Sequence, residues 1–230
     1  MSKEDPSTQV ELVIPLFPLP NTVFYPETLL PLHIFEPRYR EMTRDALDGD
    51  GKIGMILLKP DYESEYFDRP GIHKIGCMGN IEKYVQLPDG KFNFTLKGMS
   101  RFEIIEEIKD KPYRRARVLI WKDVNDRNIE LGSDDLAEEL KKKFTSYCVR
   151  LKELGVPGKS HDLRTCKTLG GLVDILAMDL DFPTEKKQYF LEERDAGKRA
   201  HQLLNELNLK YDLISISYER NKTQSDPNWN

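Results

Sequence analysis

The feature that most constrains this fold is a change in the spacing of apolar residues near Asn125. Before it, short apolar runs are separated by Pro, Gly and Asp, and several runs alternate with a period of two. After it, apolar residues recur every three to four positions. A period of two is typical of strands, and a period of 3.6 is typical of amphipathic helices. The pattern predicts an α+β chain, with a β-rich region followed by a helical region.

The β-rich region is predicted to span 11–122. Its clearest element is a hairpin over 76–96, whose turn at 87–90 has the sequence Leu-Pro-Asp-Gly. The proline presets its own φ, and the glycine accommodates a positive φ. Because the strands are joined by short links, we expect an antiparallel or mixed closed sheet rather than a βαβ fold. One inserted helix is predicted to begin at Pro37 and to end at 48–51.

The helical region is predicted to span 133–217 as a bundle of about four helices. Ser133 is a good N-cap for the first helix, and Gly155 ends its apolar stripe. Because each helix has one apolar face, the helices need one another's apolar faces to bury it. The remaining stripes lie within 169–177, 184–191 and 195–214.

Two polar tails and a linker complete the predicted domain map: 1–10, 218–230 and 123–132. The N-terminus lacks the apolar stretch of a signal peptide, and no apolar run approaches the length that spans a bilayer. Three widely spaced cysteines suit a reducing cytoplasm. The net charge of −4 disfavours a dedicated nucleic-acid-binding protein.

Short motifs that suggest enzymatic chemistry lack what that chemistry requires. Residues 158–160, Gly-Lys-Ser, end like a phosphate-binding loop, but Glu153 stands where the first glycine is needed. An ordinary loop between helices is favoured there. Residues 160–162, Ser-His-Asp, are adjacent, and adjacent residues do not adopt triad geometry. The four histidines form no metal-spaced pair, so we expect neither a metal nor a cofactor, and a structural role for His33.

A local basic cluster is the main sign of nucleic-acid binding. No aromatic platform is interleaved with it, since Tyr113 stands alone. A solvated strand edge, whose charges deter aggregation, is therefore favoured over an RNA-binding surface. The cluster comprises Lys109, Lys111, Arg114, Arg115 and Arg117.

Three stretches near the N-terminus form a long and specific motif. They are Ile14-Pro15-Leu16-Phe17-Pro18-Leu19-Pro20, Thr22-Val23-Phe24-Tyr25-Pro26 and Leu30-Pro31-Leu32-His33-Ile34-Phe35-Glu36-Pro37-Arg38-Tyr39-Arg40-Glu41-Met42. The motif resembles the N-terminal domain of Lon proteases, and is nearer still to bacterial proteins that contain little else. Later features agree in order, and the resemblance covers about 10–215. Those features are Gly54, Gly76, the turn at 87–90, Gly98, Arg101-Phe102 and Arg199 before Leu203-Leu204.

The resemblance implies a PUA-like β pseudo-barrel followed by a helical bundle. It also implies a non-catalytic, substrate-binding role, since ATP hydrolysis and peptide cleavage in the full proteases belong to later domains. The candidate binding residues lie in the third stretch and are expected mainly to specify the fold. They are His33, Phe35, Glu36, Arg38 and Tyr39.

The motif also makes local predictions. Leu30, Leu32 and Ile34 alternate and should face the core, Phe35 should staple the start of the helix at Pro37, and Arg38 is placed to pair with Glu36 or to cap barrel carbonyls. Glu27 stands where the family often has glycine. If the backbone there requires a positive φ, the glutamate is strained.

The main functional hypothesis is an adaptor or receptor that binds unfolded or degron-bearing polypeptide and works with proteolytic machinery. Its physical basis is an exposed sheet edge, or a cleft between the β-rich and helical regions, offering main-chain hydrogen bonds and apolar contacts. The alternative is RNA binding through the barrel, which rests on analogy of fold alone. A hydrolase is a third class, for which the sequence offers no site. No membrane partner is expected.

Overall fold

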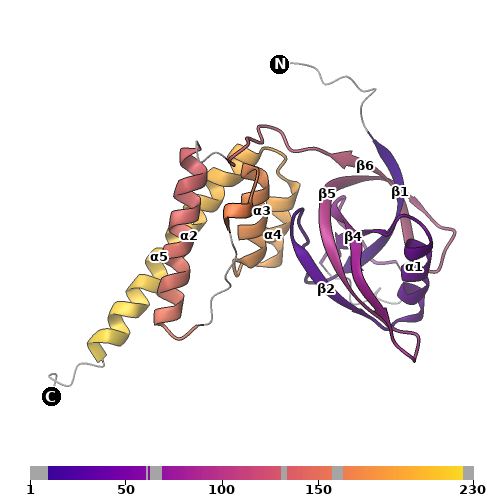
Figure 1. The fold of residues 1–230 in the computed structure, drawn as a ribbon, viewed down its shortest axis with the longest axis horizontal. Coiled ribbons are helices and arrows are strands. Elements are labelled where there is room, and N and C mark those ends of the chain that lie inside the picture. Colours follow the sequence, from indigo (N-terminus) through magenta and orange to yellow (C-terminus); the bar gives the residue numbers. More distant parts are fainter. Residues whose placement is uncertain (1–9, 61, 63–68, 131–133, 157–162, 225–230) are drawn as a thin grey trace. The chain divides into compact units, whose positions relative to one another are not determined.

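A computed structural model describes the chain in five segments and shows two compact units (Figure 1). The β unit contains Met1–Lys122 and Leu180–Arg194, and the helical unit contains Asp123–Asp179 and Asp195–Asn230. The α+β class predicted from the sequence is confirmed. The described segments are residues 10–60, 62, 69–130, 134–156 and 163–224.

Six strands form the sheet of the β unit (Figure 1). Their order is β2-β5-β4-β3-β1-β6, and β6 also pairs with β5. This second pairing closes β5, β4, β3, β1 and β6 into a ring, so the sheet is a pseudo-barrel with β2 outside the ring. The pairing of β1 with β3 is parallel and the other strand pairings are antiparallel. The strands are β1 (Glu11–Leu19), β2 (Leu29–Ile34), β3 (Lys52–Leu57), β4 (Ile75–Gln86), β5 (Phe92–Ile108) and β6 (Arg114–Trp121).

A cluster of alternating residues from five strands forms the core of the ring. Alternation places one side chain in two on the inner face, which explains the period of two in the sequence. Cys77 is also fully buried in β4. The core cluster comprises Ile14, Leu16, Ile56, Met78, Phe102, Ala116 and Val118.

Two turn positions of the β unit have a positive φ, and the turn chemistry predicted at 87–90 is confirmed. Gly90 has φ 79°, and its amide donates to the Leu87 carbonyl at 2.8 Å, which closes the hairpin between β4 and β5. Glu27 has φ 61°, in the left-handed region that favours glycine, and its amide donates to the Gly98 carbonyl. The position that the family often fills with glycine therefore does require a positive φ.

Helix α1 (Pro37–Asp48) covers the β unit with Tyr39, Met42 and Ala46 buried. Its N-cap residue is Glu36, and proline occupies the first helical position, as predicted. The amide of Gly51, with φ 73°, donates to the Ala46 carbonyl at 2.9 Å beyond the end of the helix.

Helix α4 (Thr184–Glu192) groups with the β unit, which corrects the predicted four-helix bundle. Three long-range hydrogen bonds explain this placement. Gln188 Nε2 donates to the Ile75 carbonyl at 3.0 Å, Arg101 Nε donates to the Leu191 carbonyl at 2.9 Å, and the Tyr25 hydroxyl donates to the Lys187 carbonyl at 2.6 Å. Helix α4 is thus tied to β4, to β5 and to Tyr25 within the β unit.

The helical unit contains α2 (Asp135–Glu153), the short 3-10 helix η3 (Leu163–Thr165), α3 (Leu169–Asp179) and α5 (Ala196–Gln224). Cations on α2 lie over aromatic rings on α5: Lys143 over Tyr211 and Arg150 over Tyr218. From the first pair to the second, the residue number increases along both helices. Helices α2 and α5 therefore run parallel, side by side (Figure 1). The buried side chains of this unit include Leu140, Phe144, Leu172, Leu176, Leu203 and Leu207.

The predicted boundaries of the helical region need three corrections. The N-cap of α2 is Asp134, whose carboxylate accepts from the Ala137 amide at 3.0 Å, rather than Ser133. The predicted linker at 123–132 is packed into the unit over its described part, because Ile129 is buried and the Val124 carbonyl accepts from the Ala196 amide. Helix α5 continues to Gln224, into the predicted tail at 218–230.

Candidate functional site

The five predicted site residues lie in one strip, from the end of β2 into α1, and divide into two groups. The first group is exposed. The Nδ1 atom of His33 lies 2.6 Å from Asn93 Oδ1 on β5, and the His33 ring stacks on Phe35 with centroids 6.1 Å apart. This supports the predicted hydrogen-bonded role of His33 and leaves Phe35 with 57% of its surface exposed.

The second group, Glu36, Arg38 and Tyr39, is held by its own contacts. Both Nε and Nη2 of Arg38 lie 3.0 Å from Glu36 Oε2, so the predicted pairing is confirmed. The same guanidinium lies 4.6 Å from the centroid of the Tyr39 ring, which packs against Phe17. These contacts hold the three side chains together at the start of α1.

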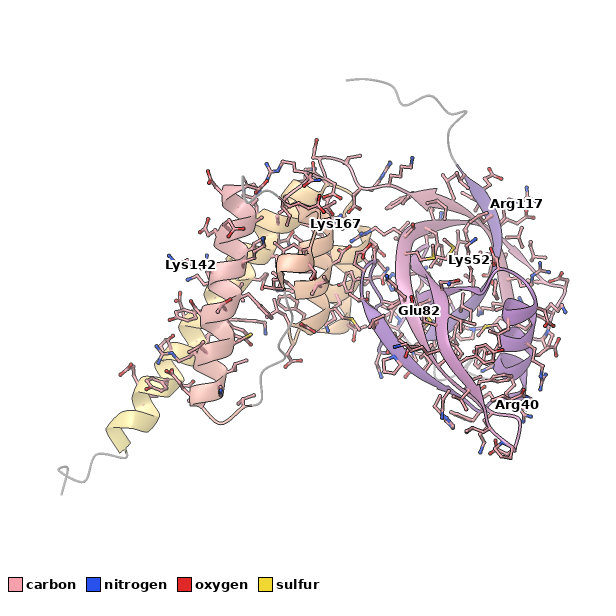
Figure 2. All side chains as sticks on the ribbon, in the orientation of Figure 1. Arg40, Lys52, Glu82, Arg117, Lys142 and Lys167 are labelled. Atoms are coloured by element: carbon pink, nitrogen blue, oxygen red, sulfur yellow. The ribbon has the colours of Figure 1, made fainter. Side chains whose placement is uncertain are left out.

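Phe35 does not staple the start of the helix as predicted. A hydrophobic staple joins the residue before the N-cap to an apolar residue at the fourth helical position. That position is Arg40, which is shown in Figure 2. Since no apolar partner exists there, Phe35 stays exposed and contacts His33 instead. An aromatic ring is therefore displayed at the end of β2.

Strand β2 and the adjoining parts of β5 and β4 form what we call the ribbon, residues 29–34, 92–97 and 80–86. Its inner face is apolar: Leu30, Leu32 and Ile34 lie opposite Leu96, Phe94 and Phe92. Among these, Ile34 and all three residues of β5 are buried. The expectation that the alternating residues of β2 face the core is confirmed.

The outer face of the ribbon contains three cross-strand rows. Leu29, Lys97 and Asn80 form the first, Pro31, Thr95 and Glu82 the second, and His33, Asn93 and Val85 the third. Glu82 is labelled on β4 in Figure 2. Leu29 is 57% exposed and Val85 is 58% exposed. This face thus combines polar side chains, among them the charged Lys97 and Glu82, with exposed apolar groups along its length.

Sequence reasoning missed Leu29 and Val85. A signal for Leu29 was present, because the alternation that directs Leu30 and Leu32 inward directs Leu29 outward. No such signal existed for Val85. The face of the sheet on which Val85 lies is set by a shift of register between Glu82 and Val85, where Lys83 has φ 48°. A bulge of this kind depends on the pairing with β5 rather than on local sequence.

Four of the five cations of the predicted basic cluster lie beside carboxylates. Lys111 Nζ lies 2.8 Å from Asp45, Arg115 lies 2.5 Å from Asp110, and Arg114 lies 3.2 Å from Glu107. Arg117, labelled in Figure 2, lies 3.8 Å from Glu106. Arg114 is buried and also donates to the Pro70 carbonyl at 2.5 Å. The cluster is a set of ion pairs, which is a poor footprint for a phosphate backbone.

Electrostatic perturbation is concentrated around Asp45 on α1. The hydrogen bond from Lys111 is the main reason that the pKa of the Asp45 carboxyl lies below its usual value. The Tyr113 hydroxyl also donates to Asp45 at 2.5 Å, and burial, followed by this contact, raises the pKa of Tyr113 well above its usual value. These groups join α1 to the start of β6, so their role is structural.

The helical unit has an open hollow of about 810 Å³ at the start of α5. Its charged groups are engaged within the protein. Arg127 Nε lies 2.6 Å from Asp134, and Asp195 accepts from the Lys198 amide at 2.9 Å and from Asn125 at 2.7 Å. The hydrogen bond from the Lys198 amide is the main cause of a lowered pKa for Asp195. The hollow therefore shows the geometry of a capped helix start.

The two short motifs at 158–160 and 160–162 lie outside the described residues. Within the described segments, no group of three or more His, Cys, Asp or Glu side chains is placed to hold a metal ion. None of the helices in that part of the chain combines the length and the apolar character needed to cross a bilayer.

Solved structures share this architecture and define its class. A Lon N-terminal domain protein from Xanthomonas campestris superimposes with a TM-score of 0.60 at 22% identity, covering 84% of this chain and 98% of that one. The N-terminal domain of a Lon protease of the Mycobacterium avium complex gives a TM-score of 0.63 at 16% identity, covering 86% and 98%. The fold is that of a Lon N-terminal domain.

The chain belongs to the family of ATP-dependent protease La (LON) substrate-binding domains, whose model matches residues 13–208. Lon protease 2 of Myxococcus xanthus is 29% identical over 222 residues, which cover 94% of this chain and 25% of that protein. Lon protease of Anaeromyxobacter dehalogenans is 27% identical, with 94% and 25% covered. The chain therefore spans about a quarter of the length of these relatives, in their substrate-binding region.

Proposed function

We propose that this chain binds extended segments of other polypeptides along β2 and the outer face of the ribbon. In this role it serves as a receptor or adaptor for unfolded or degron-bearing proteins and works with proteolytic machinery. The observation that carries the proposal is an outer strand, β2, flanked by the exposed apolar side chains of Leu29 and Phe35. Membership of a substrate-binding family supports the same conclusion.

The ribbon suits clients of varied sequence. A binder of many clients needs contacts that any polypeptide offers, namely main-chain hydrogen bonds and adaptable apolar surface. The distance from Leu29 to Phe35 along an extended strand is about 20 Å, which matches a client segment of about six residues. Ordering such a segment opposes binding, so the affinity is expected to be on the order of micromolar.

A cytoplasmic site of action is consistent with the cysteines. Cys77, Cys148 and Cys166 are thiols that form no disulfide bond. Free thiols are typical of a reducing compartment.

RNA binding is the weaker function because the basic cluster is paired. Cations that are already paired with carboxylates neutralise few phosphates, so few counterions are released from the nucleic acid on binding. A salt series separates the two ideas: polypeptide binding should change little between low and high salt, whereas RNA binding falls steeply. Salt-sensitive binding of single-stranded RNA that is lost on Arg115→Ala and Arg117→Ala, without polypeptide binding, contradicts the proposal.

The direct test is fluorescence anisotropy with a labelled unfolded polypeptide and the variants Leu29→Ser and Phe35→Ser. Burying a large apolar side chain contributes about 1.5–3 kcal/mol, and 57% of the surface of Leu29 and of Phe35 remains to be buried. Each variant should therefore lose about 1 kcal/mol of binding, or about fivefold in affinity. Both residues are exposed, so the variants should fold normally.

Ile105→Ser is the matched control. Ile105 is as exposed as Leu29 but lies on β5 beyond the ribbon. The control should bind like the unaltered protein. Equal binding by all three variants, or a loss confined to the control, would show that the ribbon is not the site.

A further inference from the structure

The free edge of β2 has a defined pattern of main-chain donors and acceptors. In an antiparallel pair, hydrogen-bonded and non-hydrogen-bonded residue pairs alternate. The Gly98 amide donates to the Thr28 carbonyl at 2.8 Å, so this pair is hydrogen-bonded. Continuing the β2–β5 register from that pair, Leu30, Leu32 and Ile34 bond to β5. The main-chain groups of Leu29, Pro31 and His33 therefore point away from β5, towards the open edge.

Pro31 occupies the middle of this outward row. Proline has no amide proton, so the edge offers three carbonyls, at Leu29, Pro31 and His33, but amide donors only at its two ends. Within the described residues, no backbone hydrogen bond from another segment reaches these outward groups. The edge is therefore open and richer in acceptors than in donors.

We propose that an extended segment of a client polypeptide adds to this edge as a further strand. The segment is free of proline at the residues facing β2, and its alternate residues are apolar. This inference rests on the proposed function and specifies the client and its mode of binding. When the client runs antiparallel to β2, the client residues that donate to the three carbonyls are those directly opposite Leu29, Pro31 and His33. In a sheet, residues directly opposite each other share a face.

The alternation required of the client follows from that geometry. The donating client residues place their side chains on the outer face, next to Leu29 at one end and the rings of His33 and Phe35 at the other. Apolar residues at these alternate positions complete the contact. In a folded protein such a segment is a strand with one buried face. It becomes available when the client unfolds, so the edge is expected to bind unfolded chains in preference to folded ones.

Pro31 also discriminates between a client and a second copy of this chain. When a client pairs with β2, the missing amide proton of Pro31 removes only one hydrogen bond. The client amide opposite Pro31 still donates to the Pro31 carbonyl. When two copies pair antiparallel about Pro31, both central bonds are lost. The proline therefore protects the edge against self-pairing more than against a client, as expected of edge-strand prolines.

The first test is Pro31→Val, which restores the amide proton and keeps an apolar side chain. A net hydrogen bond changes affinity by roughly five- to tenfold, so the variant should bind an unfolded polypeptide about fivefold more tightly. It should also self-associate more in sedimentation velocity. Unchanged or weaker polypeptide binding by a folded Pro31→Val variant, judged by circular dichroism, overturns the inference.

The second test replaces single amides of a bound model peptide by esters, which removes one N–H at a time. Affinity should fall at every second position and stay unchanged between them. Equal losses at all positions, or none, overturn the added strand even if Leu29→Ser and Phe35→Ser weaken binding. In that case the proposed function stands and only its mode is wrong. The unaltered protein is also tested for dimers. A dimer that added peptide does not dissociate identifies a second copy as the occupant of the edge, and this result also overturns the inference.

Discussion

Arg199 connects three segments of the helical unit, and its replacement gives the sharpest stability test. Its side chain is 0% exposed. The guanidinium donates to both carboxylate oxygens of Asp123, at 3.1 and 2.5 Å, and lies 3.8 Å from Asp174, which is 1% exposed. Asp123 is the first residue of the unit, Asp174 belongs to α3 and Arg199 to α5. The network therefore holds the start of the unit against two helices.

Arg199→Met keeps the length of the side chain and removes its charge. The variant leaves two carboxylates, one of them fully buried, without their cation. Breaking a buried ion pair in this way costs about 3–5 kcal/mol. Asp123 keeps some contact with solvent, so we expect the lower end, about 3 kcal/mol. With a denaturant slope of about 1.5 kcal/mol per molar, the urea midpoint of the helical unit should fall by about 2 M.

Urea unfolding followed by circular dichroism at helical wavelengths measures this change. Lys141→Ala is the control, because Lys141 pairs at 2.9 Å with the exposed carboxylate of Glu138 on α2. Such a surface pair contributes at most about 0.5 kcal/mol. Arg199→Lys should fall between the two, since lysine keeps the charge but cannot reproduce the two parallel bonds. A loss below about 1 kcal/mol for Arg199→Met would refute the reasoning from burial.

Three other changes test the β unit, and an activity assay tests the expected lack of catalysis. Glu27→Gly should stabilise the folded protein by about 0.5 kcal/mol, because a left-handed φ of 61° strains a residue with a Cβ. Gly98→Ala should destabilise it by about 2 kcal/mol, because the new Cβ would meet the Tyr25 carbonyl. Thermal unfolding measures both changes. Asp45→Asn should destabilise near neutral pH and lose this effect in acid. The folded pKa of Asp45 is lowered, so its stabilisation is present above the unfolded value of 3.8 and is lost as the pH falls through the folded value. The purified chain should hydrolyse neither ATP nor peptides, and turnover that Lys159→Ala abolishes would contradict this.

Each of these tests has a result that separates the alternatives. If Gly98→Ala is neutral, the close approach of β5 to the turn after Tyr25 is not rigid. If Asp45→Asn shows the same loss at every pH, the effect comes from packing rather than from charge. Turnover unaffected by Lys159→Ala points to a contaminating enzyme.

The sequence predicted the parts of this fold that depend on neighbouring residues. The turn at 87–90, the helix that begins after Glu36 and the inward phase of Leu30, Leu32 and Ile34 all follow from the φ preferences of proline and glycine or from strand geometry. These properties act over a few residues, so the order of amino acids is sufficient to reveal them. The family motif added the class of protein.

Most of the candidate site was visible from the sequence as a motif, but not as a surface. His33 and Phe35 were identified, yet Phe35 was expected to be covered by α1 and is exposed instead. Its exposure follows from Arg40 at the position where a staple needs an apolar residue. Val85 joins the same face through a bulge that only the pairing of β4 with β5 creates.

The amino-acid sequence by itself determined which segments are strands and helices, because hydrophobic period and turn chemistry are local properties of the backbone. Only the tertiary structure decided their partners. It placed α4 on the β unit through Arg101 and Gln188, paired the basic cluster with carboxylates, and pointed the main chain of Pro31 towards an open edge. These outcomes depend on residues far apart in the chain, whose contacts exist only after the whole sheet has closed and each apolar face has found the surface that buries it.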